Sequence, residues 1–451
     1  PGEAVSTGTI ARYVQGAYAK PAYAVESFDV RAWPGLAMVV DALQLGGYEV
    51  GYCGEATAHK HAVILVSITS GCDWWSFIAE RERWRPGDYT VIVGGPGCLN
   101  VRPFLCWFDV AVFGRAEDLI VMLVRETLAG HRMDHPSVCY ADSFAMDRTY
   151  QIAQASQPWP HSVRLESGKL WTERAIGCQR KCLFCAYTWQ RRNIGGDQSG
   201  SGAADAMWNR PDDEVTVFDL DLARPGTWPG FRIIGMDGMS ERLRRAINKP
   251  ITRDMLRSLF AGLCQRTDQH EVKVYNIVGY PTETKDDWRE FLDDLRSVDS
   301  MASKGKQWKL VVHCTPFRPM PATPAACWPM AKTEHRGQIA ATLKSASNPG
   351  QVFYQGNRFW ALESLGTDSL PTVALDAVVI RGTEADSENV GRIARTRKFW
   401  NADTATKLAT LAKCFDLDTL FGEFIAETLP TRNLRTYAKV ERSWGRRPWA
   451  T

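Results

Sequence analysis

Three closely spaced cysteines, Cys178, Cys182 and Cys185, constrain this chain more than any other feature of its sequence. They follow a short apolar run and are separated by three and then two residues. Three thiolates on so short a loop can converge on one soft metal centre. A structural zinc site would require a fourth ligand, whereas a four-iron cluster held by three cysteines leaves one iron open to a small molecule. A zinc knuckle and unrelated thiols are the alternative interpretations.

The remaining composition describes a globular protein of a reducing compartment. With 451 residues, the chain is long enough for two or three domains. It has 45% hydrophobic and 23% charged residues and a net charge of +3, so the totals indicate no strong polyanion-binding field. The other nine of the 12 cysteines are scattered, which favours buried free thiols over a disulfide framework. We find no signal peptide and no bilayer-spanning run, and expect a cytoplasmic protein without a membrane partner.

Residues 1–145 alternate between short apolar runs and amphipathic segments. Strands are predicted at 61–68, 89–94 and 109–113, because continuous apolar runs are typical of strands buried on both faces. Helices are predicted at 37–45 and 119–128. This alternation predicts an α/β, doubly wound, Rossmann-like domain with a parallel sheet.

The polar, proline-containing stretch 146–170 is interpreted as a linker. From 171 to 348 the alternation resumes, and it predicts an open, partial (β/α)6 barrel whose active site lies at the carboxyl ends of the strands. Strands are expected at 215–220, 231–236, 271–278 and 308–315, helices at 240–247 and 285–298. The glycine-rich segment 191–202 is expected to be a loop covering the site.

Residues 349–451 are predicted to form a small C-terminal α+β region that binds or caps the substrate. Within it we expect a strand at 373–380 and a helix at 404–415 with Asp403 as its N-cap. The basic tail 432–449 carries interleaved aromatic residues. Such a tail can stack on bases and neutralise phosphates, although a solvated face anchored by aromatics is the commoner use.

The cysteine loop, with Phe184 before its third cysteine, resembles the signature of the radical S-adenosylmethionine (radical SAM) superfamily. Four later stretches resemble successive strand ends in members of that family that carry a cobalamin-binding domain. They begin at Ile234, Ile247, Ile277 and Phe317 and occur in the family's order. The resemblance covers residues 171–325 and implies a [4Fe-4S] cluster and S-adenosylmethionine as cofactors.

The first 145 residues also resemble the cobalamin-binding (B12-binding) domain that precedes the radical SAM core in that subclass. Val93-Gly-Gly-Pro and Val112-Phe-Gly-Arg-Ala-Glu-Asp are similar to two of its turns. The cobalamin-ligating pattern Asp-x-His-x-x-Gly is absent from the whole sequence. Either cobalamin binds without a histidine ligand, or the domain keeps the fold and has lost the cofactor; we favour the second.

By resemblance, the three cysteines ligate the cluster and the backbone near Phe184 approaches the adenine of SAM. Polar and glycine positions at the strand ends are expected to bind the rest of the cofactor: Asp219, Asp221, Gly235, Ser240, Lys249, Asn276 and Gly279. For the polar members, a helix cap or a turn residue is the competing interpretation. No catalytic residue beyond the cofactors is assigned.

The resemblance implies an enzyme in which a 5′-deoxyadenosyl radical abstracts hydrogen from a substrate carbon, leading to rearrangement, alkylation or methylation. It would receive its electron from a reductant protein such as a flavodoxin or ferredoxin. Radical isomerisation or other modification of a hypermodified nucleobase, for example in phage DNA, is one alternative. A cobalamin-dependent C-methyltransferase is another. The alternatives outside that class are an iron–sulfur electron carrier or sensor and a zinc-bound nucleic-acid module.

Overall fold

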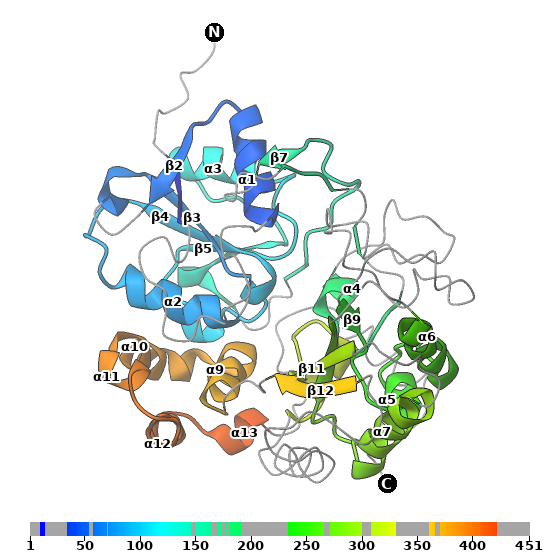
Figure 1. The fold of residues 1–451 in the computed structure, drawn as a ribbon. Coiled ribbons are helices and arrows are strands. Elements are labelled where there is room, and N and C mark those ends of the chain that lie inside the picture. Colours follow the sequence, from blue (N-terminus) through cyan, green and yellow to red (C-terminus); the bar gives the residue numbers. More distant parts are fainter. Residues whose placement is uncertain are drawn as a thin grey trace.

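The computed structural model describes residues 10–13, 34–53, 57–69, 71–145, 150–164, 170–173, 176–177, 180–190, 233–265, 271–299, 308–330, 360–365 and 370–421. These residues form a mixed α/β protein built on parallel sheets (Figure 1). The strand predicted at 215–220, the glycine-rich segment and the basic tail lie outside the described residues.

The first sheet has six strands in the order β2-β1-β3-β4-β5-β6. Strands β1 to β5 are parallel, and β6 runs antiparallel to β5 at the edge. The strands are Ile10–Tyr13 (β1), Val50–Cys53 (β2), Val63–Ser67 (β3), Thr90–Gly94 (β4), Val110–Val112 (β5) and Val138–Tyr140 (β6). In doubly wound sheets with the parallel order 2-1-3-4-5, ligands bind beyond the carboxyl ends of the strands, where the strand order reverses between β1 and β3.

Both faces of this sheet are covered, as its continuous apolar strands predict. Val63 and Leu65 pack on one face against α1 (Pro34–Leu45) and α3 (Ile120–Leu128). Ile64 and Val66, which alternate with them, pack on the other face against α2 (Gly71–Arg81). The predicted helices at 37–45 and 119–128 are therefore confirmed.

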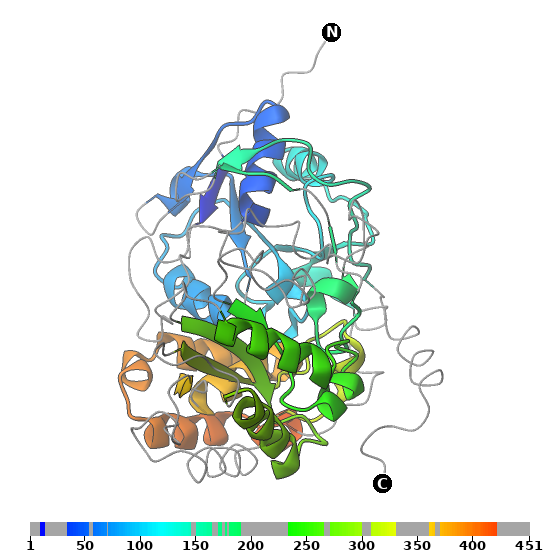
Figure 2. The same ribbon diagram turned by 45° about the vertical axis from the view of Figure 1, so that its right-hand side comes forward.

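The C-terminal helices complete the α2 face of this sheet instead of forming a core of their own. They are α9 (Leu370–Arg381), α10 (Ser387–Arg395), α11 (Arg397–Trp400), α12 (Thr404–Cys414) and α13 (Leu417–Phe421). Their buried side chains share one hydrophobic cluster with β3, β4 and α2, and Figures 1 and 2 show α9 and α10 lying directly against α2. The predicted helix at 404–415 is confirmed, with the Asp403 carboxylate accepting the Thr406 N–H at 2.8 Å.

The strand predicted at 373–380 is wrong, because these residues form the middle of helix α9. All eight residues are buried, since α9 packs against α2, α12 and α13 on different sides. A helix enclosed on all sides is apolar on all sides, so its sequence lacks the 3.6-residue periodicity that distinguishes a helix from a buried strand. Within the predicted region 349–451, the described elements are the strand Trp360–Leu365 and, from residue 370 to 421, helices, so only the strand at 373–380 is corrected.

The second sheet contains four parallel strands in the order β12-β11-β10-β9. They are Ile233–Gly235 (β9), Glu271–Val278 (β10), Trp308–Pro316 (β11) and Trp360–Leu365 (β12), accompanied by α5 (Glu241–Ala246), α6 (Arg253–Gln265) and α7 (Lys285–Asp299). The strands and helices expected between 231 and 316 are thus present. Strand β12 extends this sheet beyond the boundary predicted at residue 348.

Between the two sheets, β7 (Val163–Arg164) and β8 (Leu170–Trp171) form a short antiparallel hairpin within and just beyond the predicted linker. The chain then enters the cysteine loop and the short helix α4 (Ala186–Gln190). In the part of the chain that the structure describes, no helix has the length and apolar character needed to cross a bilayer.

Candidate cluster and cofactor site

The described half of the cysteine loop is bound to the mouth of the second sheet through its backbone. The Leu183 N–H donates to the Ile247 carbonyl at 2.9 Å, and the Leu183 carbonyl accepts the Ala325 N–H at 3.1 Å. The Asn248 amide donates to the Lys181 carbonyl at 2.9 Å. Segments that follow two different strands, β9 and β11, therefore hold the loop from both sides.

Within the loop, the two described cysteines stand one turn apart. Cys182 is buried and Cys185 partly so, and the Cys185 N–H donates to the Cys182 carbonyl at 3.2 Å. The Trp189 indole N–H donates to the same carbonyl at 2.8 Å. Lys181 takes a left-handed φ of 53°, which turns the chain sharply before Cys182.

A lysine–aspartate pair lies beside these thiols at the carboxyl end of β9. The Lys249 ammonium is 2.7 Å from an Asp237 carboxylate oxygen. Burial opposes the charge on Lys249, but its pKa is nevertheless raised because Asp237, Cys182 and Cys185 favour the ammonium form. Of the residues predicted to bind the cofactor, Lys249 and Gly235 are brought to this point: a Cβ on Gly235 would lie 3.8 Å from the Lys249 ammonium.

An aromatic cluster closes the mouth above β10. Phe184 packs against Tyr280, and Tyr280 packs against Phe317 with ring centroids 5.0 Å apart. The Tyr280 hydroxyl donates to the Asp237 carbonyl at 3.0 Å. Burial, and then the nearby Asp237 and Glu283 carboxylates, raise the pKa of Tyr280 well above its ordinary value, so it remains a neutral donor.

Gly279 serves the turn that leads out of β10. Its φ is 86°, in the left-handed region that favours glycine. Its N–H and that of Tyr280 donate to the buried carboxylate of Glu283, which also accepts the Trp288 indole N–H at 2.8 Å. Burial raises the pKa of Glu283 to about 7. The Gly-Tyr-Pro-Thr-Glu stretch therefore forms a turn in which the glutamate accepts hydrogen bonds from the first two backbone N–H groups.

Ser240 acts in the structure as a helix cap, the competing interpretation of that residue. Its hydroxyl accepts the Leu243 N–H at 3.1 Å at the start of α5 and donates to the Asp287 carboxylate. The hydroxyl proton is therefore used within the fold.

Asn276 lies on the face of β10 opposite to the cysteine loop. Ile277 packs with Leu183 and therefore faces the loop, and side chains alternate along a strand. Asn276 is 1% exposed, and neither polar atom of its side chain has a hydrogen-bond partner among the described residues. The structure therefore does not bring Asn276 to Lys249 and the thiols.

The donor set fits an iron–sulfur cluster as far as it is described. Cys178, Asp219 and Asp221 lie outside the described residues, and among the residues described no three potential ligands come together. Two thiols three positions apart on one loop, near a partly buried ammonium, suit a cluster of negative charge.

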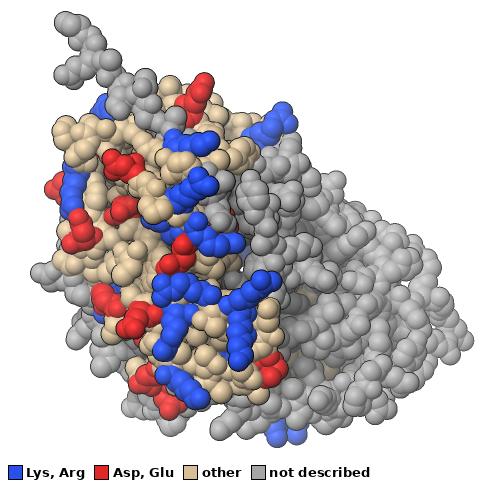
Figure 3. Space-filling model, turned by 90° about the vertical axis from the view of Figure 1, so that its left-hand side faces the viewer, with Lys and Arg blue, Asp and Glu red and all other residues tan. Residues whose placement is uncertain are grey.

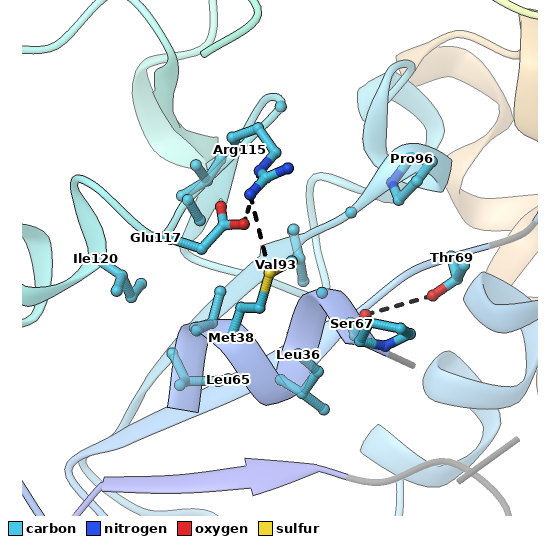
Figure 4. A pocket seen from close by; sticks show the side chains of 18 of the residues that line it. Leu36, Met38, Leu65, Ser67, Thr69, Val93, Pro96, Arg115, Glu117 and Ile120 are labelled. Atoms are coloured by element: carbon cyan, nitrogen blue, oxygen red, sulfur yellow. Dashed lines mark hydrogen bonds and ion pairs between the residues drawn. The ribbon is translucent and has the colours of Figure 1, made fainter. Parts of the chain in front are cut away.

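A second feature, a cavity of about 460 Å³, lies at the carboxyl edge of the first sheet (Figure 4). It also reaches the cysteine loop. Its lining includes the ends of β3, β4 and β5, the start of α1, and also Cys185 and Tyr187. In its wall, the buried Arg115 guanidinium contacts Glu117 at 2.7 Å and binds Glu173 through two hydrogen bonds of 2.7 and 2.8 Å. Desolvation opposes the charge on Arg115, but the two carboxylates outweigh it and raise its pKa.

The glycines at this edge serve different purposes. A Cβ on Gly95 would lie 2.5 Å from the Ile68 carbonyl oxygen, and one on Gly114 would lie 2.5 Å from that of Ala153. Both have positive φ, so the fold itself requires glycine there. A Cβ on Gly94 would meet nothing closer than 3.7 Å. Of these three glycines, only Gly94 could carry a Cβ without a clash.

Sequence reasoning missed Asp237, Arg115 and the contact between the cavity and Cys185. Asp237 directly follows a predicted strand, and its φ of 59° is one that aspartate tolerates better than most residues, so its position was a usable signal. The Arg115–Glu173 pair joins residues 58 positions apart and had no local signal.

No protein-family model matches the chain, and no curated protein sequence matches it. Among solved structures, the chain is similar to OxsB, described as a cobalamin-dependent S-adenosylmethionine radical enzyme. For OxsB with aqua-cobalamin and S-adenosylmethionine bound, identity is 12% and the TM-score 0.27. With aqua-cobalamin alone, identity is 13% and the TM-score again 0.27. Each match covers 97% of this chain but 61% of OxsB, so the chain spans less than two thirds of that enzyme's length. At this TM-score the likeness does not assign a family, and what is shown is a mixed α/β protein with parallel sheets.

Proposed function

We infer that the protein is a radical SAM enzyme that abstracts a hydrogen atom from a substrate carbon. The observation that carries this inference is that the loop bearing Cys182 and Cys185 is held at the mouth of a parallel sheet, by hydrogen bonds of Leu183 and Lys181 to segments that follow β9 and β11. When bound there, a [4Fe-4S] cluster supplies the electron that cleaves S-adenosylmethionine into methionine and the 5′-deoxyadenosyl radical, which takes hydrogen from the substrate. Cys178 is the expected third ligand. A flavodoxin or ferredoxin is the expected reductant.

The chain's own residues would orient the cofactors and exclude water. The Lys249 ammonium offsets the negative charge of the thiolates and is itself held by Asp237. Phe184, Tyr280 and Phe317 form an apolar wall at the mouth, which keeps water from a reactive radical. Tyr275 pairs in register with Gly235, so Tyr275 and Ile277 face the mouth and are candidates to contact the adenosyl group.

Cobalamin chemistry is not part of this proposal. The cavity at the edge of the first sheet is where a ligand of that domain would lie, but its described lining contains no imidazole. The sequence also lacks the Asp-x-His-x-x-Gly pattern. The resident residues thus do not fit a histidine-ligated corrin, which favours rearrangement or carbon–carbon bond formation over methyl transfer.

A small-molecule substrate is favoured over nucleic acid. On the face of the molecule shown in Figure 3, Lys and Arg side chains form a band that Asp and Glu side chains flank and interrupt. Elsewhere in the described residues, basic side chains are paired with carboxylates, as in Arg102–Glu384 and Arg395–Glu82. Nucleic-acid binding favours an uninterrupted basic stripe, and the described part of this face does not present one.

The test is purification without oxygen, followed by the visible spectrum, iron and sulfide analysis, and reaction with S-adenosylmethionine and dithionite. We expect a brown protein with about four irons per chain, the content of a [4Fe-4S] cluster, that forms 5′-deoxyadenosine. The matched control is Cys106→Ala, which removes an exposed cysteine far from the loop in sequence. A colourless, iron-free protein, or one that leaves S-adenosylmethionine intact, would refute the proposal.

A further inference from the structure

The walls of the cavity come from two parts of the chain that are distant in sequence. One wall is the carboxyl edge of the first sheet, with Ser67, Gly94 and Glu117; the other includes Cys185 and Tyr187 of the cysteine loop. A molecule that filled the cavity would therefore touch both the sheet edge and the loop expected to hold the cluster. Radical chemistry acts only on a C–H bond placed against the radical, and a molecule in this cavity would lie next to the loop expected to hold the cluster.

The chemistry of the lining selects a neutral, mainly apolar occupant. Most of the side chains that line the cavity are aliphatic, among them Leu36, Val39, Leu65, Ile92 and Ile120. The polar groups drawn in Figure 4 already bind one another: Ser67 and Thr69 share a hydrogen bond of 3.4 Å, and Arg115 contacts Glu117. A charged ligand would have to break such a pair or be buried uncompensated, which is costly.

The size of the cavity also limits the occupant. A volume of 460 Å³ falls within the range of roughly 300–1,000 Å³ that is typical of small-molecule sites. We propose that this cavity is the substrate chamber of the radical reaction, and that its occupant is a small, neutral, mainly apolar organic molecule with one C–H bond facing the Cys185 loop. With both cofactors bound, that hydrogen atom would pass to the 5′-deoxyadenosyl radical, which would give 5′-deoxyadenosine and leave a carbon radical on the substrate. This assignment rests on the proposed function.

Gly94 offers a way to fill the chamber without disturbing the fold. Its added Cβ would make only ordinary contacts, the nearest being the Val112 carbonyl oxygen at 3.7 Å. Gly94→Val therefore places two methyl groups at the edge of the cavity. Thr90→Val is the matched control, because Thr90 begins the same strand at its opposite end and does not line the cavity. Val39→Phe fills the chamber from α1 and serves if Gly94→Val lowers the thermal midpoint.

The probe is 4-fluorobenzyl alcohol carrying two deuterium atoms on its benzylic carbon, and 4-fluorobenzoate is its charged counterpart. Binding to the full chain is measured by fluorine NMR. Deuterium transfer into 5′-deoxyadenosine is measured by mass spectrometry with the reconstituted, reduced protein. We expect the alcohol to bind at least ten times more tightly than the benzoate, and to label 5′-deoxyadenosine with deuterium. Gly94→Val should reduce both binding and labelling at least tenfold, while Thr90→Val leaves both unchanged.

Four results would overturn the assignment: no binding of the alcohol, equal binding of the benzoate, binding unaffected by both filling variants, or 5′-deoxyadenosine without deuterium. Binding of hydroxocobalamin that displaces the alcohol and is lost in Gly94→Val would assign the cavity to a corrin, and would overturn it as well. If S-adenosylmethionine is not cleaved at all, the proposed function fails, whereas the fluorine NMR still decides whether the cavity takes a neutral apolar molecule.

Discussion

Replacing Arg381 with methionine should destabilise the protein by about 3 kcal/mol, because this side chain joins three segments in the interior. Its guanidinium is 2% exposed and donates to the carbonyls of Leu420, Ala326 and Trp328, at 2.9 Å, 3.2 Å and a shorter distance. Burial lowers the pKa of Arg381 to about 10, with the Cys327 thiol acting in the opposite direction, so the guanidinium is charged at neutral pH. Methionine fills similar volume but satisfies none of the three carbonyls.

The magnitude follows from the cost of leaving buried acceptors without donors. Each costs about 1–3 kcal/mol, and the lower end applies because removing the charge also removes its desolvation penalty. Three acceptors at about 1 kcal/mol each give about 3 kcal/mol, a large part of the roughly 5–15 kcal/mol that typically stabilises a domain. The control is Arg102→Met, which breaks a pair whose Glu384 partner is 40% exposed and should cost less than about 1 kcal/mol.

The assay is urea unfolding of the oxygen-protected protein, followed by tryptophan fluorescence. Arg381→Met should lower the urea midpoint much more than Arg102→Met does, and Arg381→Lys should recover part of the loss. Iron content should also fall, since Ala326 directly follows Ala325 and the Trp328 N–H donates to the Ala325 carbonyl, while the Ala325 N–H donates to the Leu183 carbonyl. If the two methionine variants unfold at the same urea concentration, Arg381 is not the support that its contacts indicate.

Three further predictions concern single residues. Cys182→Ala or Cys185→Ala should remove the visible absorbance of the cluster and most of the iron while leaving the far-ultraviolet circular dichroism unchanged; retention of iron in both would contradict the ligand assignment. Folding raises the pKa of Glu283 from its ordinary value of 4.5 to about 7, so the folded state binds more protons than the unfolded state between these values. The stability that this residue contributes is therefore lost as pH rises from about 4.5 through 7. The urea midpoint should fall over that pH range in the native protein, and should fall less in Glu283→Gln. Gly95→Ala should destabilise the protein by more than about 1 kcal/mol, because the φ of residue 95 is 110° and the added Cβ would meet the Ile68 carbonyl. Gly94→Ala should be tolerated, and equal thermal midpoints for the two variants would contradict this account.

The helices and strands that could be predicted from the sequence are those buried on one face only, because their apolar residues then recur with a regular spacing. Helix α7 shows this, because its buried side chains, such as Phe291, lie on the side that packs against α5 and α6, whereas Asp286 and Arg289 are exposed. The strand at 271–278 and the cap at Ser240 were likewise readable from local pattern. Helix α9 was misread because tertiary packing on every side erased its period.

The candidate site was predictable only in part, for a similar reason. A cysteine triplet is a local signal, and Lys249 lies in a stretch that resembles a known strand end. The direction in which Asn276 points depends instead on the register of β10 against β9, which the sequence alone does not reveal. The cavity is still less local, since its two walls are joined only when the chain has passed through the Val163–Trp171 hairpin.

The shared packing of the C-terminal helices changes where the chain can be divided. A cut at residue 348 follows the boundary predicted from the sequence, but it would remove β12 from the second sheet and expose the α2 face of the first. Trp75 of α2 is 1% exposed and belongs to the cluster that these helices complete, and uncovering such apolar surface costs about 25 cal/mol per Å². We therefore expect the chain truncated at 348 to be insoluble or molten by near-ultraviolet circular dichroism, whereas the full chain is not. A truncated protein that unfolded cooperatively and retained iron would show that the first sheet and the cysteine loop do not depend on α9.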